Sequence, residues 1–186
     1  MNKYLFSFLI ILFIVTSCDN NNNNNNIDNI VLSENIELYN EDLISDDYIF
    51  VVENSSTYSY LINKEGYKLW EWNFDTTSGN DLEILDNGNI IGLFKTPNPS
   101  IDFGGFGGTA KLIDSNGNTI WEFTVSDENF NAHHDVEMLP NGNVLMMVWE
   151  RITNQTAVQN GVDFNTDIFA EKIIEVNPSN NQIVWE

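Results

Sequence analysis

Two short sequence units recur along this chain, and this repetition constrains the fold more than any other feature. The first unit is a polar turn and then an apolar run that ends in an aromatic and acidic pair, found at residues 63–72, 114–123 and 177–186. The second unit places Asn-Gly-Asn between two apolar runs, at residues 82–91 and 136–145. Such self-similarity is typical of architectures that stack one supersecondary unit on the next.

Apolar and polar residues alternate within these units, and Asn-Gly turns join them, which is the pattern of antiparallel hairpins. No segment shows a convincing helical period. The spacing of Trp70, Trp121 and Trp185 is close to or somewhat above the roughly 40–50 residues of a propeller blade, the excess being loop. The sequence therefore predicts an all-β fold, a β-propeller of four-stranded antiparallel blades.

About three blades are predicted, at about 36–75, 82–125 and 136–186. The expected strands of the second and third blades are 82–86, 89–95, 109–114, 119–125, 136–140, 143–149, 171–177 and 182–186. The first blade has clear strands at 48–53, 57–63 and 67–74, with 36–39 assigned as its innermost strand. Propellers have about four to eight blades, so we expect the sequence to be the N-terminal part of a longer protein or a truncated gene product.

Residues 1–17 have the features of a signal peptide, with Lys3 before an apolar run that is too short to span a bilayer comfortably. The run ends in Val-Thr-Ser-Cys, which resembles a bacterial lipobox and predicts a lipid on Cys18, the single cysteine. An ordinary signal peptide with a chance cysteine is the alternative. Residues 18–35, rich in asparagine, are expected to be a tether. This predicts a lipid-anchored protein of the bacterial cell envelope, facing the periplasm or in the outer membrane.

The charge balance limits the partners of the chain. Seven Lys and Arg stand against 28 Asp and Glu, a formal net charge of −21. Nucleic acid and anionic lipid surfaces are not expected as partners because phosphate binding needs clustered cations. A chain that is 42% hydrophobic and 12% aromatic is too apolar to be disordered, so at least one core is expected.

The connections between predicted strands fall into two sets. One set are tight Asn-Gly type turns, and the other set, expected on the opposite face, are long loops at 75–81, 96–108, 126–134 and 150–170. Function usually lies on variable loops that a rigid scaffold holds. His133 and His134, the two histidines of the chain, are expected on this loop face at the start of an innermost strand, and hence at the channel mouth.

The repeat offers an internal control for these histidines, because His134-Asp135 occupies the place of Asn80-Asp81. An Asp shared by both repeats is expected to bond backbone N–H groups, whereas a residue special to one repeat indicates function. We take His134 and His133 as candidate catalytic residues, acting as nucleophile or general base; a polar cap without chemistry is the alternative.

A metal site is the weaker interpretation. Adjacent residues of an extended strand point to opposite faces, so the two histidines are not expected to share an ion, and no metal is assigned. Asp102 and Asp163 could still contribute to a Ca²⁺ site, but the chain has no EF-hand pattern.

Two cationic residues and a glycine-rich segment are further candidates for the functional site. Arg151, the single arginine, and Lys95 each begin a long loop and are candidate sulfate ligands, since a guanidinium suits an oxyanion. A surface Arg151 paired with Glu150 or Asp163 is an equal alternative. Residues 103–108 lack the lysine of a phosphate loop and are interpreted as a lid, an aromatic wall or a plain flexible loop.

The run His-His-Asp-x-x-x-Leu-Pro-Asn-Gly-Asn-x-Leu at 133–145, with the Trp-Glu endings, resembles the bacterial arylsulfate sulfotransferases. The resemblance implies a six-bladed propeller that moves a sulfuryl group from a phenolic sulfate to a phenol through a sulfated histidine, without a nucleotide donor. It makes His134 the best match for a channel histidine and Arg151 a sulfate partner. The family uses several histidines from different blades, whereas this chain has one adjacent pair.

The implied partners are therefore an aryl sulfate, a phenol and, through the lipid, a membrane. No cofactor is expected. A non-catalytic propeller lipoprotein that binds a protein or carbohydrate is the alternative from another class. A quinone-cofactor dehydrogenase is a third, because the Trp-Glu ending is also similar to that of the quinoprotein-like propellers.

Overall fold

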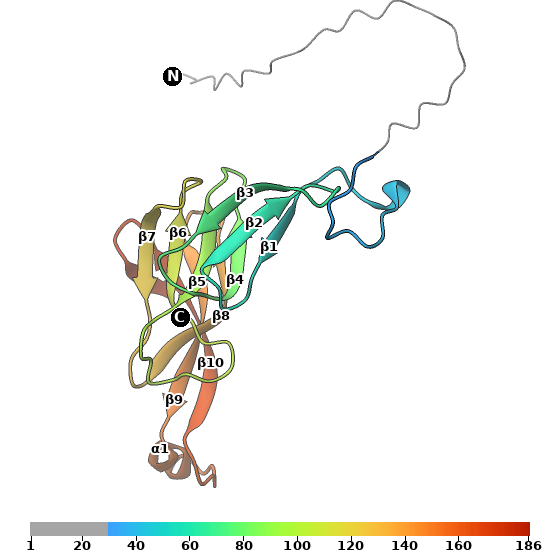
Figure 1. Ribbon diagram of the computed structural model, residues 1–186. Coiled ribbons are helices and arrows are strands. Elements are labelled where there is room, and N and C mark those ends of the chain that lie inside the picture. Colours follow the sequence, from blue (N-terminus) through green and yellow to red (C-terminus); the bar gives the residue numbers. More distant parts are fainter. Residues whose placement is uncertain (1–29) are drawn as a thin grey trace, which may run out of the picture. The chain divides into compact units, whose positions relative to one another are not determined.

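The computed structural model describes residues 30–186, and residues 32–186 form one compact unit (Figure 1). The predicted signal peptide, Cys18 and most of the predicted tether lie outside the described residues. No helix among residues 30–186 has the length and apolar character needed to cross a membrane.

Three antiparallel sheets make up this unit, and in each of them strands that are consecutive in the sequence pair side by side. The first sheet contains β1 (Ile49–Val52), β2 (Tyr58–Ile62) and β3 (Lys68–Asn73). The second contains β4 (Ser78–Ile84), β5 (Ile90–Lys95), β6 (Gly108–Ile113) and β7 (Thr119–Thr124). The third contains β8 (Phe130–Met138), β9 (Val144–Ile152), β10 (Ile168–Asn177) and β11 (Gln182–Trp185). The predicted all-β class of blade-like sheets is confirmed.

The second sheet lies between the other two and buries both of its faces. Alternation along β5 sends Ile91 and Leu93 toward the third sheet and Ile90 and Phe94 toward the first. Two apolar layers result, because side chains of a strand alternate between faces. This is the stacking expected of successive propeller blades.

The hairpin turns follow the predicted Asn-Gly pattern. In the turn after β8, Gly142 has φ of 82°, and its N–H donates to Leu139 O at 2.8 Å. The last hairpin has no glycine, and Asn181 takes the left-handed conformation there with φ of 56°. Asparagine tolerates this region better than other residues with a side chain.

The prediction of the innermost strand in the first blade was wrong. Residues 36–39 form no strand; Ile36 instead packs its side chain against Gly66 in the β2–β3 turn, so the first sheet has three strands. Two short helices also occur, η1 (Glu41–Leu43) and α1 (Asn154–Gln159). Thr153 caps α1 by accepting from Thr156 N–H, and a helix of fewer than two turns shows no period in a sequence. In Figure 1, α1 lies at the tip of the β9–β10 hairpin.

Candidate active site

The histidine pair lies within strand β8 rather than in the loop before it. The register of β8 against β9 shifts between Ala132 and Val136, and His134 sits in this bulge with φ of 55°. A bulge interrupts the alternation of side chains. The two imidazoles consequently lie together, with 2.8 Å between His133 Nδ1 and His134 Nδ1. The prediction that they point to opposite faces was wrong for this reason.

His133 is buried, with 1% of its surface exposed, and is held on three sides. Its ring stacks on Trp149 with centroids 4.0 Å apart. Its Nε2 lies 2.8 Å from Glu171 Oε2, although the N–H direction is off the line to that oxygen. Burial lowers the pKa of His133, and Glu171 opposes this shift. His133 is therefore neutral at neutral pH.

Strand pairing brings Glu171 to this position. Trp149 on β9 and Glu171 on β10 are directly paired residues, so their side chains share one face of the third sheet. The Trp149 indole N–H donates to Glu171 Oε1 at 3.3 Å. The same carboxylate thus contacts both the indole and the imidazole that stack on each other.

The glycine-rich loop between β5 and β6 reaches across to the third sheet and contacts both histidines. His134 N–H donates to Gly105 O at 2.9 Å, and Phe106 forms an isolated bridge with His133. Phe103 stacks on Trp149 with centroids 4.5 Å apart. This arrangement fits the aromatic wall considered from the sequence.

The exposed side chain of His134 shares its surroundings with Asn80, the residue at the same place in the preceding repeat. A Cβ atom at Gly105 would lie 2.6 Å from His134 Nε2 and 1.8 Å from Asn80 Nδ2. Both nitrogens therefore border the same point of the loop.

Two carboxyl groups lie beside the histidines. Burial, and then the neighbouring charge of Asp135, raise the pKa of Asp81 to about 6. The backbone N–H of Val136 faces this carboxyl group and opposes the rise of its pKa. The interpretation of the shared Asp as a backbone acceptor agrees with this contact.

The two predicted sulfate ligands are engaged elsewhere. Arg151 lies two residues after Trp149 on β9, on the same face, and its Nε donates to Asp167 Oδ2 at 2.7 Å. Its ion-pair partner is thus Asp167 rather than Glu150 or Asp163. Lys95 Nζ donates to Ser55 Oγ at 2.8 Å and lies 4.9 Å from the centre of the Phe106 ring. In these contacts, neither Arg151 nor Lys95 interacts with His134.

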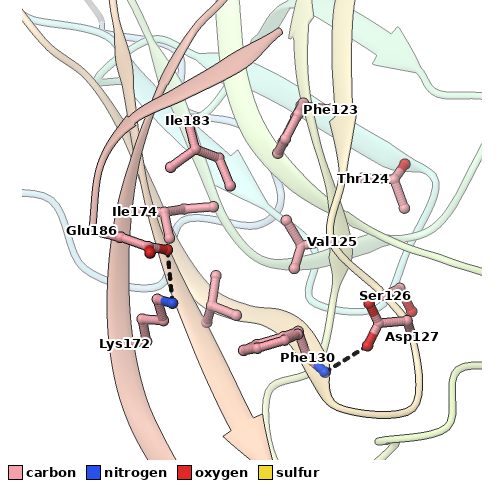
Figure 2. A pocket seen from close by; sticks show the side chains of 11 residues that line it. Phe123, Thr124, Val125, Ser126, Asp127, Phe130, Lys172, Ile174, Ile183 and Glu186 are labelled. Carbon is pink, nitrogen blue, oxygen red and sulfur yellow. Dashed lines mark hydrogen bonds and ion pairs between the residues drawn. The ribbon is translucent and has the colours of Figure 1, made fainter.

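A pocket of about 340 Å³ lies between the end of β7 and strands β10 and β11 (Figure 2). Phe130 and Lys172 line it, and Lys172 Nζ pairs with Glu186 Oε2 at 2.7 Å. By strand alternation these side chains lie on the face of the third sheet opposite Trp149 and Glu171. The pocket is separate from the histidine site.

Among residues 30–186, no group of three or more His, Cys, Asp and Glu side chains is arranged to hold a metal ion. The site is instead an imidazole pair backed by a carboxylate and an aromatic stack. Such an arrangement can supply a nucleophilic or basic nitrogen.

Fold and site together define a protein with propeller-like blades and a histidine-based site under a glycine-rich loop. The chain matches the sequence model of the family described as Arylsulfotransferase (ASST) over residues 21–186 and belongs to this family. The resemblance seen in the sequence is thereby confirmed. No curated protein matches the chain.

Sequence reasoning missed Glu171, Trp149 and Asn80 as parts of this site. Asn80 was signalled by its alignment with His134 in the repeat. Glu171 carried no such signal, because its pairing with Trp149 depends on the register of a hairpin whose connecting loop contains α1.

Proposed function

We propose that this protein transfers a sulfuryl group from a phenolic sulfate ester to a phenol through a sulfohistidine at His134. The observation that carries the proposal is the environment of His134: an exposed imidazole in a strained bulge, whose Nδ1 contacts a buried histidine. Strained backbone conformations cluster at functional sites. Membership of the arylsulfotransferase family supports the same reaction class.

The free nitrogen of this imidazole is Nε2, because Nδ1 is occupied by His133. In the first half of the reaction, Nε2 attacks the sulfur, the bond from sulfur to the aryl oxygen breaks, and the phenolate leaves. In the second half, the oxygen of the acceptor phenol attacks the sulfur, the N–S bond breaks, and the phenolic proton passes to solvent. Two such steps replace one difficult transfer, which is the general advantage of covalent catalysis.

Side chains around His134 suit the two parts of an aryl sulfate. Phe103 and Phe169 are partly exposed and lie edge to face, with centroids 4.8 Å apart, so they offer an apolar surface to a phenyl ring. The Asn80 side-chain amide borders the same point of the glycine-rich loop as His134 Nε2, and in this proposal it donates to a sulfate oxygen. Arg151 becomes a sulfate ligand in this proposal if its guanidinium exchanges Asp167 for the substrate, and Lys95 is a more distant candidate.

The test uses purified protein with 4-nitrophenyl sulfate as donor and phenol as acceptor, following release of 4-nitrophenolate. We expect turnover in the parent and a loss of about a hundredfold or more in His134→Ala, as for removal of a nucleophile. Labelled sulfate should be trapped on His134 when the acceptor is omitted. Gln182→Ala, an exposed change on β11, is the control. Turnover retained in His134→Ala would refute the role of His134, and no turnover in either protein would favour a binding role.

We also propose that Cys18 carries a lipid that anchors the protein in the bacterial cell envelope. The support is the small-residue sequence before this single cysteine and the polar tether after it. Cells grown with labelled palmitate should label the parent and not Cys18→Ser, and the variant should leave the membrane fraction. A labelled Cys18→Ser protein would disprove this anchor.

A further inference from the structure

We infer that Asp167 occupies the Arg151 guanidinium in the empty protein, and that an aryl sulfate binds by taking Arg151 from Asp167 and releasing the loop that contains α1. This loop comprises residues 153–167. Asp167 is then a competitor built into the site, and the loop is a latch that opens as the donor binds. The inference rests on the proposed function for its ligand, an aryl sulfate, and does not depend on which nitrogen accepts the sulfuryl group.

Arg151 lies beside an apolar surface that suits a phenyl ring. Arg151 on β9 and Phe169 on β10 are directly paired, so their Cβ atoms lie about 4.5–5.5 Å apart on one face of the third sheet. Phe103 from the glycine-rich loop meets Phe169 edge to face, with centroids 4.8 Å apart. The side chains of all three residues are open to solvent. A ring held by Phe103 and Phe169 therefore has its sulfate within reach of the guanidinium.

The guanidinium is the group on this surface that suits a sulfate. It presents planar N–H donors to an oxyanion and keeps its positive charge at physiological pH. The chain offers little else for an anion, because Arg151 is its single arginine and the formal net charge is −21. Four lysines are each paired with a carboxylate elsewhere, namely Lys64, Lys68, Lys111 and Lys172. The state of Arg151 therefore decides whether this surface holds an anion.

The Asp167 carboxylate uses its two oxygens for different partners. Oδ2 accepts from Arg151 Nε at 2.7 Å and lies 2.5 Å from Arg151 Nη2. Oδ1 accepts from the backbone N–H of Asn154, the first residue of α1, at 2.8 Å. The Asn154 N–H, and then Arg151, lower the pKa of Asp167, so this carboxylate is charged at neutral pH. One carboxylate thus joins the guanidinium to the start of the helix.

Asp167 and a sulfate compete for one edge of the guanidinium. Nε and Nη2 form this edge, and both converge on a single Asp167 oxygen. A sulfate that approached the same edge would meet a negative carboxylate, and like charges in contact repel. Replacement exchanges one set of charge-assisted hydrogen bonds for another. The Arg151 and Asp167 side chains are 39% and 26% exposed, and such exposed pairs contribute little to stability, so the exchange costs little.

Few contacts other than this ion pair hold the α1 loop. Among the described residues, the hydrogen bonds of residues 153–166 go to other residues of this loop or to Asp167. Ala157 is the single buried residue of α1, whereas Phe164 is 56% exposed. Figure 1 shows the helix at the tip of the β9–β10 hairpin. Segments with so few packed side chains open locally at a low cost in free energy, so loss of the Arg151 contact frees the loop.

Donor binding and loop opening are therefore linked in both directions. A ligand that takes Arg151 loosens the loop, and a change that removes Asp167 from Arg151 raises the affinity for the ligand, because such coupling is reciprocal. The competition also favours aromatic donors. Inorganic sulfate gains nothing from Phe103 and Phe169, so it displaces Asp167 less readily than an aryl sulfate does.

The test measures binding of 4-nitrobenzenesulfonate, which has the ring and the oxyanion of a donor but no transferable sulfuryl group. In isothermal titration, Asp167→Asn keeps an oxygen for the Asn154 N–H and should bind about tenfold more tightly than the parent. Arg151→Met should bind about tenfold more weakly or not at all. Asp163→Asn removes the same charge from the same loop, but Asp163 is not the ion-pair partner of Arg151, so this control should match the parent. Inorganic sulfate should bind the parent more weakly than the sulfonate does.

The parent protein alone gives a second measurement. Hydrogen exchange of the backbone amides in residues 153–167 should become faster when the sulfonate is added, while the amides of β5 should not change. Asp167→Asn should show the faster exchange without ligand. Unchanged or slower exchange of the loop on binding would overturn the latch, because the ligand would then leave the loop closed.

The outcomes separate this inference from the proposed function. Weaker binding in Asp167→Asn would show that Asp167 orients Arg151, and an equal gain in Asp163→Asn would assign the effect to net charge; either result overturns the inference. Absence of sulfonate binding in both the parent and Asp167→Asn overturns it as well. The expected binding and exchange in a protein that transfers no sulfuryl group would support the latch and refute the proposed function. Turnover in a protein that fails these tests would leave the proposed function and reject the latch.

Discussion

The indole N–H of Trp121 on β7 donates to Oδ1 of Asn181 at 2.7 Å and so ties the second sheet to the last turn of the third. The first sheet makes a similar contact, from Trp72 Nε1 to Ser115 O at 3.2 Å. The first and second sheets therefore each send one indole to the outer turn of the sheet that follows. These hydrogen bonds are directional, whereas the apolar packing between the sheets is not.

Two substitutions of Asn181 measure separately how much the hydrogen bond from Trp121 and the backbone strain of the turn contribute to stability. Asn181→Gly keeps the left-handed conformation and loses the acceptor, and should lower the free energy of unfolding by about 0.5–1 kcal/mol. Asn181→Ala should lose about 1 kcal/mol more, because alanine at φ of 56° is strained. Urea denaturation measures both. Equal midpoints for the two variants would show that the turn carries no strain.

Asp81 gives the stability a distinct pH dependence. Its pKa is about 6 in the folded protein against an ordinary value of 3.8, so between these values the folded state binds more protons than the unfolded state. Stability from this group therefore falls as pH rises from about 4 to 6. Above pH 6 its charge destabilises the fold.

Asp81→Asn removes this cost and keeps an oxygen for Val136 N–H. We expect a gain of about 1–2 kcal/mol at pH 7.5, reduced from the full linkage value because the group is partly solvated, and almost none at pH 4. Glu122→Gln, an exposed change on β7, gives the same change in net charge. A gain of similar size in Glu122→Gln would assign the effect to net charge instead of Asp81.

Much of this fold was predictable because its signals are local. The turn at Gly142 and the alternation along β5 need only a few adjacent residues, and they located the strands of the second and third sheets. The bulge at His134 is different, because it depends on a hydrogen bond from His134 N–H to Gly105 O of a distant loop. No periodicity in β8 encodes that contact.

The site was predictable only in part for the same reason. Comparison of the repeats identified His134, because a histidine can act as a nucleophile or a base wherever it lies in the fold. The neighbours of His133 come from β9, β10 and the loop after β5, and only tertiary structure brings them together. Arg151 was assigned from its charge, but the partner that its guanidinium contacts, Asp167, lies across the α1 loop.

The buried Lys111 makes a further prediction about stability. Its Nζ lies 2.7 Å from Asp75 Oδ1 and 3.1 Å from Thr76 Oγ1, and it lowers the pKa of Asp75. Asp75→Ala leaves a buried ammonium with one hydroxyl partner and should cost about 1–2 kcal/mol, discounted because Asp75 is largely exposed. Lys111→Met keeps the aliphatic packing and should cost less. Thermal unfolding would contradict this order if Lys111→Met were the less stable variant.

Gly105 tests whether the loop places the active-site side chains. Its backbone φ lies outside the left-handed region, so alanine brings no backbone strain, but the new Cβ would lie 1.8 Å from Asn80 Nδ2 and 2.6 Å from His134 Nε2. Both atoms are at the ends of side chains that can move, so the fold should survive. We expect kcat/KM to fall about tenfold or more, because small displacements of reacting groups are costly.

Gly142→Ala is the matched control, since this glycine has φ of 82° and open space around it. Alanine there should lower the stability by about 1 kcal/mol and leave kcat/KM unchanged. The two substitutions should therefore differ in their effects. Gly105→Ala should lower the activity, whereas Gly142→Ala should lower the stability. Sulfuryl transfer rates and denaturation midpoints of both variants measure this directly. A Gly105→Ala protein with full activity would show that the loop does not position His134.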